Sequence, residues 1–158
     1  MGLFNWLSSR VGNDLDEQVH GPAGGAQVGF DIVSAEAPIV IHAQILDLHE
    51  AEISFVAVAD TQQGSEPLKH DQHTTEGSLT VDLGKAELWR GGTLTIAARV
   101  NRKGLHNELA VLVVEVKQPA QPASSAAPVA FQTYSVEARF NDAGKAQLEL
   151  VVRIASST

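Results

Sequence analysis

Residues 39–59, IVIHAQILDLHEAEISFVAVA, decide the fold because their hydrophobic pattern has a period of two. The apolar positions at the start of this stretch are Ile39, Ile41, Ala43 and Ile45. In an extended strand, alternate side chains share a face, so these residues point inward and leave His42 and Gln44 on the other face. After a turn at 49–52, residues 53–59 are apolar on both faces. That second pattern is typical of a central strand that is covered on both sides.

The same alternation recurs along the chain and predicts about eight strands. Further inward positions are Val28, Phe30, Ile32, Leu79, Val81, Leu83, Leu94, Ile96, Ala98 and Val100. Turn signals at 101–104 and 141–144 suggest that sequential hairpins join most of the strands. The longest stretch without a strand pattern is 60–76. We therefore predict an all-β fold, an antiparallel β-sandwich that is immunoglobulin-like or jelly-roll-like.

Residues 1–20 have a different period and predict a short amphipathic helix, followed by a Gly-rich linker at 21–26. The apolar stripe and its aromatic neighbours are Leu3, Phe4, Trp6, Leu7, Val11 and Leu15. A helix this short is marginal alone in water, so Leu3, Phe4, Trp6, Leu7 and Val11 are expected to contact the sandwich or a neighbouring subunit. A membrane-surface role is disfavoured because Arg10 is followed by three acidic residues within the next seven.

Residues 118–129 separate the sandwich core, 27–117, from a C-terminal β-hairpin, 130–158. The segment is rich in Pro, Ala and Ser and carries no charge, which is typical of an extended tether. An isolated hairpin is marginal in water and must dock, either on the chain's own sheet or on the sheet of a neighbouring copy. The candidate contact residues in this hairpin are Tyr134, Phe140, Leu148, Leu150, Val152 and Ile154.

Composition limits the functions that the chain can have. A formal net charge of −8 disfavours nucleic-acid binding, which needs a Lys- and Arg-rich surface. The absence of cysteine excludes disulfides, thiol catalysis and Cys-based zinc sites. The first residues lack a secretory signal pattern, so a cytoplasmic location is expected. Only 5% of the residues are aromatic, which predicts an aliphatic core.

His70, His73 and Glu76 form the cluster best suited to metal chemistry, because imidazoles and a carboxylate are ligands for Zn, Fe or Ni. Residues 64–84 resemble the first metal motif of the cupin family, with a Gly, a His pair, a Glu and a later Gly. Cupins place the two His one residue apart, whereas two residues intervene here. The resemblance implies a divalent metal held by these three side chains.

The sequence contains no nucleophile elbow, P-loop or zinc-protease motif. We therefore expect no enzymatic activity and no cofactor, but a structural protein that forms homo-oligomers or a larger assembly such as a virion. The contacts would come from the N-terminal helix and the C-terminal hairpin. Two alternatives stay open: a cupin-like metal-dependent enzyme or sensor, and a membrane- or partner-binding module anchored by the helix.

Overall fold

The computed structural model describes residues 23–47, 49–60, 66–103, 108–119 and 128–156. Within these ranges the chain forms strands β1 (Ala23–Ile32), β2 (Pro38–Ile45), β3 (Glu50–Ala59), β4 (Leu68–Thr74), β5 (Ser78–Lys85), β6 (Thr93–Asn101), β7 (Leu109–Gln118), β8 (Ala130–Arg139) and β9 (Lys145–Ser156), and the 3₁₀-helix η1 (Ala86–Trp89). The predicted N-terminal helix lies outside the described residues, as do Leu3, Phe4, Trp6, Leu7 and Val11.

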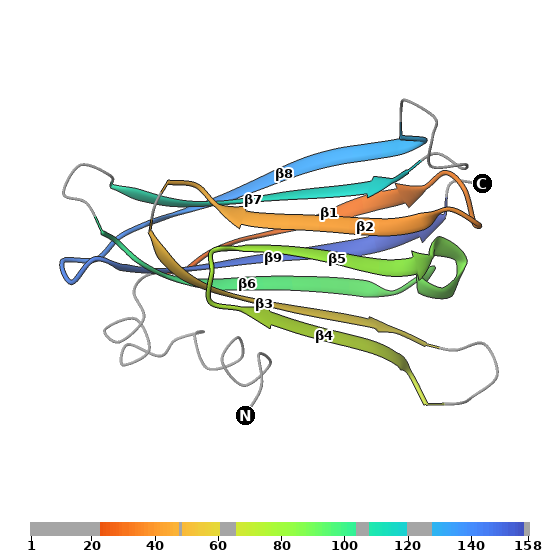
Figure 1. Cartoon of the computed structure of the whole chain (residues 1–158), viewed down its shortest axis with the longest axis horizontal. Coiled ribbons are helices and arrows are strands. Elements are labelled where there is room, and N and C mark those ends of the chain that lie inside the picture. Colours follow the sequence, from red (N-terminus) through yellow and green to blue (C-terminus); the bar gives the residue numbers. More distant parts are fainter. Residues whose placement is uncertain (1–22, 48, 61–65, 104–107, 120–127, 157–158) are drawn as a thin grey trace.

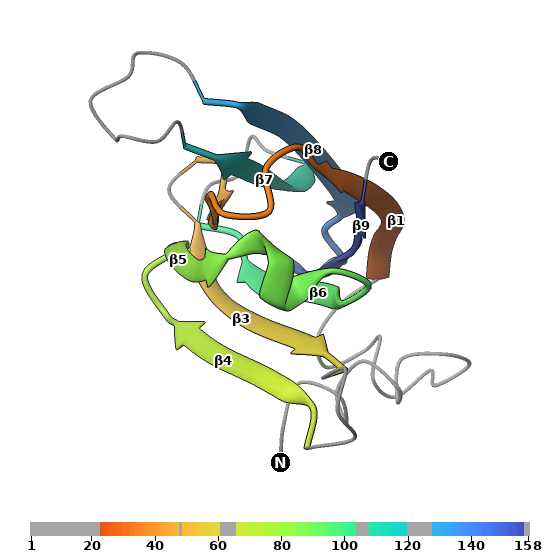
Figure 2. The same cartoon turned by 90° about the vertical axis from the view of Figure 1, so that its right-hand side faces the viewer.

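Two β-sheets pack face to face (Figures 1 and 2). One has five strands in the order β1-β9-β6-β3-β4, and the other has four in the order β5-β2-β7-β8. This confirms the prediction of an all-β, two-layer fold. The pairing departs from a purely antiparallel sandwich at one place, because β1 runs parallel to β9.

The prediction that sequential hairpins join most strands was wrong. Among the described strands, only β3–β4 and β7–β8 are both consecutive in the chain and hydrogen-bonded to each other. The chain otherwise passes between the sheets. The turn at 141–144 is present, with Gly144 at φ 77° and its N–H bonded to the Asn141 carbonyl at 2.9 Å. It nevertheless connects β8 in one sheet to β9 in the other.

Two strand positions also differ from the sequence prediction. Strand β4 lies inside the stretch 60–76, which carries no strand pattern because LKHDQHT is polar at almost every position. An edge strand needs few apolar side chains, so hydrophobic alternation does not reveal it. Strand β1 begins at Ala23, within the predicted linker at 21–26, and its first residues pair with β9.

The inward side chains of both sheets form one core, made mainly of Ile, Leu, Val and Ala, as predicted. All the inward positions predicted from 39–45, 79–83 and 94–100 are buried. Phe30, Phe55 and Trp89 supply the aromatic part. The indole N–H of Trp89 donates to the Leu83 carbonyl at 2.8 Å, so its one polar group is satisfied.

The C-terminal segment lies in the chain's own sheets. Strand β8 pairs with β7, and β9 inserts between β1 and β6. Its predicted contact residues Leu148, Leu150, Val152 and Ile154 are core residues, at most 2% exposed. The predicted tether, 118–129, does not span a distance either, because its first residue, Gln118, and the residue that follows it, Ala130, are partners in the β7–β8 ladder. The extended length of a segment gives only its maximum reach, and strand pairing brings these ends together.

The two sheets meet along the β1–β8 side. A Cβ at Gly24 would collide with the carbonyl oxygen of Glu137, so a glycine there allows the two backbones to approach. Farther along β1, the Tyr134 hydroxyl donates to the Gly29 carbonyl at 2.7 Å. The Tyr134 side chain is half-buried at this junction and links β8 to β1 across the two sheets.

Burial raises the pKa of Tyr134 above the ordinary value of 10.0, and the charge of Asp31 raises it further. A raised pKa in the folded state means a contribution to stability that is complete below pH 10.0 and is lost as the pH rises through the raised value. Tyr134 is the sole tyrosine, so its phenolate absorbance can be followed directly. We expect a titration midpoint above 10.0 in the folded chain, returning to about 10 in denaturant.

The Tyr134→Phe variant provides the control for this titration. It removes the ionisable group and the bond to Gly29, so its stability at neutral pH should fall slightly. Its further loss of stability in alkali should be smaller than in the unmodified chain. A folded-state midpoint at or below 10.0 would contradict the burial of the phenol at the sheet junction.

Candidate functional site

The structure does not bring the predicted metal ligands together. His70 and His73 are three residues apart in β4 and therefore face opposite sides of the sheet. The His70 ring packs edge-on against the core residue Phe55, with ring centroids 6.1 Å apart. On the other face, His73 Nε2 lies 3.3 Å from Glu52 Oε1.

Glu76 follows the end of β4 and forms an isolated parallel bridge with Ala51. Its backbone N–H donates to the Thr74 hydroxyl at 3.1 Å. Within the described ranges, no group of three or more His, Asp or Glu residues is arranged to hold a metal ion. His70, His73 and Glu76 are therefore close in sequence, but their side chains do not converge on one site in the fold.

Gln118, the last residue of β7, is fully buried and joins two parts of the chain that are far apart in sequence. Its Oε1 accepts hydrogen bonds from the backbone N–H groups of Val33 at 2.7 Å and Ser34 at 3.2 Å. Its Nε2 donates to the carbonyls of Ser34 at 2.6 Å and Ala37 at 3.3 Å. One side-chain amide thus satisfies four backbone groups of the β1–β2 loop.

Further backbone hydrogen bonds gather other segments at the same end of the sandwich. The Val129 N–H donates to the Gln118 carbonyl at 2.9 Å, which places the start of β8 beside the β1–β2 loop. The N–H of Glu87, in η1, donates to the Ala35 carbonyl at 3.0 Å. The β1–β2 loop, η1, the end of β7 and the start of β8 therefore meet at one end of the molecule (Figure 1).

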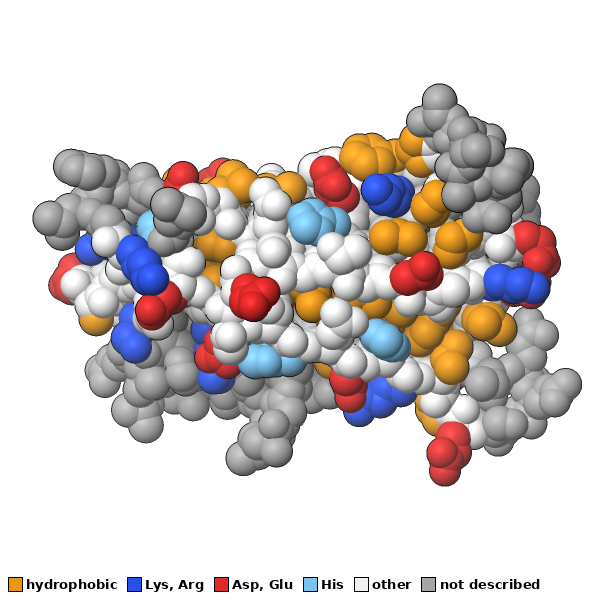
Figure 3. Space-filling model, in the orientation of Figure 1, with side chains coloured by type: hydrophobic (Ala, Val, Ile, Leu, Met, Phe, Trp, Pro, Cys, Tyr) orange, Lys and Arg blue, Asp and Glu red, His pale blue; other side chains and the backbone are white. Residues whose placement is uncertain are grey.

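Large apolar side chains are exposed at this end. Val33 is 60% exposed, Leu88 54%, Phe131 46% and Val129 43%, and we call these four residues the apolar end. Figure 3 shows apolar side chains gathered over the adjoining ends of β2, β7 and β8, at the upper right. Exposed apolar clusters of this kind mark surfaces that bind other proteins.

Charged groups border the apolar end. Lys117 pairs with Phe131 across the β7–β8 ladder, and Lys85 Nζ lies 3.1 Å from Glu36 Oε2. The hydrogen bond to Glu36 raises the pKa of Lys85, and the charges of Glu36 and Glu87 add to this effect. Both partners are largely exposed, so the ion pair contributes little to stability. An apolar centre with a charged border is the usual composition of a protein–protein interface.

The other predicted contact residues lie elsewhere. Tyr134 is at the sheet junction, and Phe140 is half-buried near the β8–β9 turn. The Phe140 ring packs edge-on against His49, with centroids 5.1 Å apart, and the Arg102 guanidinium carbon lies 5.5 Å from its centroid. Sequence reasoning missed Val33, Leu88, Val129 and Phe131. It placed Val129 in the tether and Phe131 in the C-terminal hairpin without marking either as a contact, and it assigned Val33 and Leu88 to no strand. An apolar residue in a turn or beside a proline-rich segment was the available signal.

Comparison with protein-family models, curated proteins and solved structures finds no match to this chain. In the part of the chain that the structure describes, no helix reaches the length and hydrophobicity needed to cross a membrane.

Proposed function

We propose that this chain is a non-enzymatic structural protein whose copies associate through the apolar end. The observation that carries the proposal is the exposure of Val33, Leu88, Val129 and Phe131 at one end of the sandwich. Three of the four are held in place by the Gln118 hydrogen bonds or by the β7–β8 ladder, so they form a preorganised surface. Preorganisation lowers the entropy cost of association.

A second copy of the chain is the proposed partner, because the sequence predicts a homo-oligomer in which the C-terminal segment contacts a neighbouring subunit. The contact residues predicted in β9 lie in the core, whereas two residues that were not predicted as contacts, Val129 at the end of the tether and Phe131 in the C-terminal segment, keep their side chains exposed. A stable interface needs about 800 Å² from each partner, more than four side chains supply, so neighbouring residues of β2 and β7 are included. The N-terminal helix and the immunoglobulin-like or jelly-roll-like class stay predictions within this proposal.

Light scattering on a double variant tests the proposal. Val129→Asp with Phe131→Asp places two charges in the apolar end, and desolvating them would cost more than the contact contributes. We expect the mass to fall to the monomer value of 16.8 kDa, while the unmodified chain has a higher mass. Both positions are exposed, so the variant should fold.

The matched control carries the same two charges at the opposite end of the sandwich. Leu46 and Leu109 are each 38% exposed, and the Leu46 N–H bonds to Val111, far from Gln118. Leu46→Asp with Leu109→Asp should leave the oligomer mass unchanged. If the control dissociates the oligomer and the first variant does not, the interface lies at the other end and the proposal fails.

A further inference from the structure

The outer face of the five-stranded sheet holds side chains that are too buried for a face in contact with water. Val56, Thr95, Ala97 and Gln147 point away from the core, yet they are 6%, 7%, 0% and 2% exposed, respectively. These residues lie on the central strands β3, β6 and β9 and occupy neighbouring register positions. A sheet face that is open to solvent leaves its outward side chains partly exposed.

The four-stranded sheet provides the internal comparison. The outward residues His42, Gln44, Val113 and Glu115 of its central strands β2 and β7 are only half-buried. Both faces belong to the same protein and have central strands of similar length. The difference between them therefore indicates that another segment covers the outer face of the five-stranded sheet. Among the described elements, the two sheets and η1, none forms a third layer there (Figure 2).

We propose that residues 3–15 of this chain, the predicted amphipathic helix, cover that outer face. The segment joins the sheet at the right place, because residue 22 is followed directly by β1 at the sheet edge. Ala23 pairs with Gln147, Gln147 with Arg99, and Arg99 with Glu52. Ala23 is therefore level with Gln147, Arg99 and Glu52 across the sheet. The segment before Ala23 joins the sheet beside the buried Gln147.

The dimensions of the segment and the sheet agree. Thirteen residues of α-helix extend about 20 Å, at 1.5 Å per residue. Five strands about 4.8 Å apart span about 19 Å from the first to the last. The apolar stripe of Leu3, Leu7, Val11 and Leu15 would extend about 18 Å and thus cross nearly the whole face. The small side chains of Ala97 and Ser54 near the centre of the face allow a helix to approach closely.

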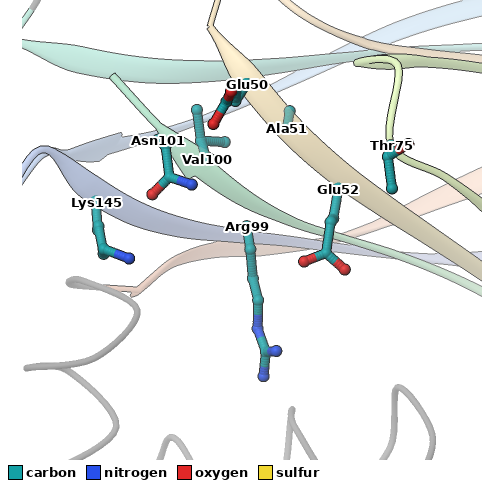
Figure 4. A pocket seen from close by; sticks show the side chains of 8 residues that line it. All are labelled: Glu50, Ala51, Glu52, Thr75, Arg99, Val100, Asn101 and Lys145. Carbon is teal, nitrogen blue, oxygen red and sulfur yellow. The ribbon is translucent and has the colours of Figure 1, made fainter. Parts of the chain in front are cut away.

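Two cations, Arg99 and Lys145, lie beside this face, together with the carboxylates of Glu50 and Glu52. Beside this face lies a pocket of about 480 Å³, lined by Glu50, Ala51, Glu52, Thr75, Arg99, Val100, Asn101 and Lys145. Figure 4 shows the Arg99 and Glu52 side chains projecting in the same direction from β6 and β3. In the sequence, three acidic residues at 14–17 follow the apolar stripe and come shortly before β1. Arg99 and Lys145 lie at the end of the sheet where this acidic stretch would arrive.

Thiol labelling of the full chain tests this placement, because the chain has no cysteine of its own. A single Val56→Cys reports the accessibility of the outer face. In that background, the double substitution Leu3→Asp with Leu7→Asp puts charges on the apolar stripe and changes none of the residues that the structure describes. We expect labelling of the cysteine at position 56 to accelerate about tenfold or more when the stripe is charged.

Two further single-cysteine chains serve as controls. Val113→Cys, on the outer face of the other sheet, should label at the same rate with and without the charged stripe. Ala110→Cys, which points into the core and is 0% exposed, should stay protected in both backgrounds and so reports that the fold is intact. If the core cysteine is exposed, the single variant Leu7→Gln, which makes the stripe polar without adding a charge, replaces the double variant.

The labelling results separate the possible occupants. Protection of position 56 that does not change on dilution supports coverage by the chain's own segment. Protection that is lost on dilution would assign the face to a second copy and overturn the proposal. Equal labelling rates with and without the charged stripe would overturn it too. Association through the outer face would leave the mass of the Val129→Asp, Phe131→Asp variant above 16.8 kDa, so failure here is distinguishable from failure of the proposed self-association through the apolar end.

Discussion

Replacing Gln118 with leucine will lower the free energy of unfolding by about 3 kcal/mol. The leucine fills a similar volume but leaves the N–H groups of Val33 and Ser34 and the Ser34 carbonyl without their side-chain partner. The Ala37 carbonyl keeps one bond, from the Ala86 N–H at 3.0 Å. Buried or half-buried polar groups that lose a partner cost about 1–3 kcal/mol each, partly recovered here by water at the loop. Urea unfolding measures the change.

Gln132→Leu is the matched control for this substitution. Gln132 lies in β8 and is exposed, so the same chemical change there should alter stability by no more than about 0.5 kcal/mol. Gln118→Glu adds a second comparison, because the carboxylate keeps the acceptor for Val33 and Ser34 but cannot donate to the carbonyls. Equal stability of the Gln118→Leu chain and the unmodified chain would show that the amide bonds do not hold the β1–β2 loop.

Replacing Gly92 with alanine will also destabilise the fold by about 3 kcal/mol, for a steric reason. The added Cβ would lie 2.7 Å from the Val58 carbonyl oxygen, 2.9 Å from the Ala59 Cβ and 2.9 Å from the Trp89 carbonyl oxygen. These atoms belong to the backbone or to a buried methyl group, so none can move away by changing rotamer. The Gly92 backbone is itself bonded to Trp89 and Ile154. Thermal and urea unfolding should both report the loss.

Gly29→Ala controls for the general effect of replacing a strand glycine. A Cβ at Gly29 would meet only the Arg153 carbonyl oxygen, at 4.0 Å, which is ordinary contact. Alanine restricts the unfolded chain more than glycine does, so this variant should be as stable as the unmodified chain or more stable by about 0.5 kcal/mol. If the Gly92 and Gly29 variants have the same stability, close packing around Gly92 is not what requires a glycine.

Much of the fold could be predicted because side-chain periodicity reports which face of a strand is buried. Ile39, Ile41 and Ile45 are buried as their spacing indicates, and so are the alternating residues of β9. Periodicity does not report which strand is the partner, however. The parallel pairing of β1 with β9 joins the two ends of the described chain, and no local signal specifies it.

The candidate site was harder to predict, because its residues have little local pattern. Gln118 stands at the start of a proline- and alanine-rich stretch and reads as part of a linker. Its role depends on four hydrogen bonds to residues more than 80 positions away. In contrast, His70 and His73 attracted a metal interpretation because their strand was not recognised. Once β4 is known, their spacing places them on opposite faces.

The mass of the unmodified chain in solution, measured by light scattering over a range of concentrations, tests the proposed self-association most directly. We predict a mass above 16.8 kDa that falls toward this value on dilution, as expected for copies that associate through a limited apolar surface. A mass of 16.8 kDa at every concentration, up to the highest that stays soluble, would contradict the account.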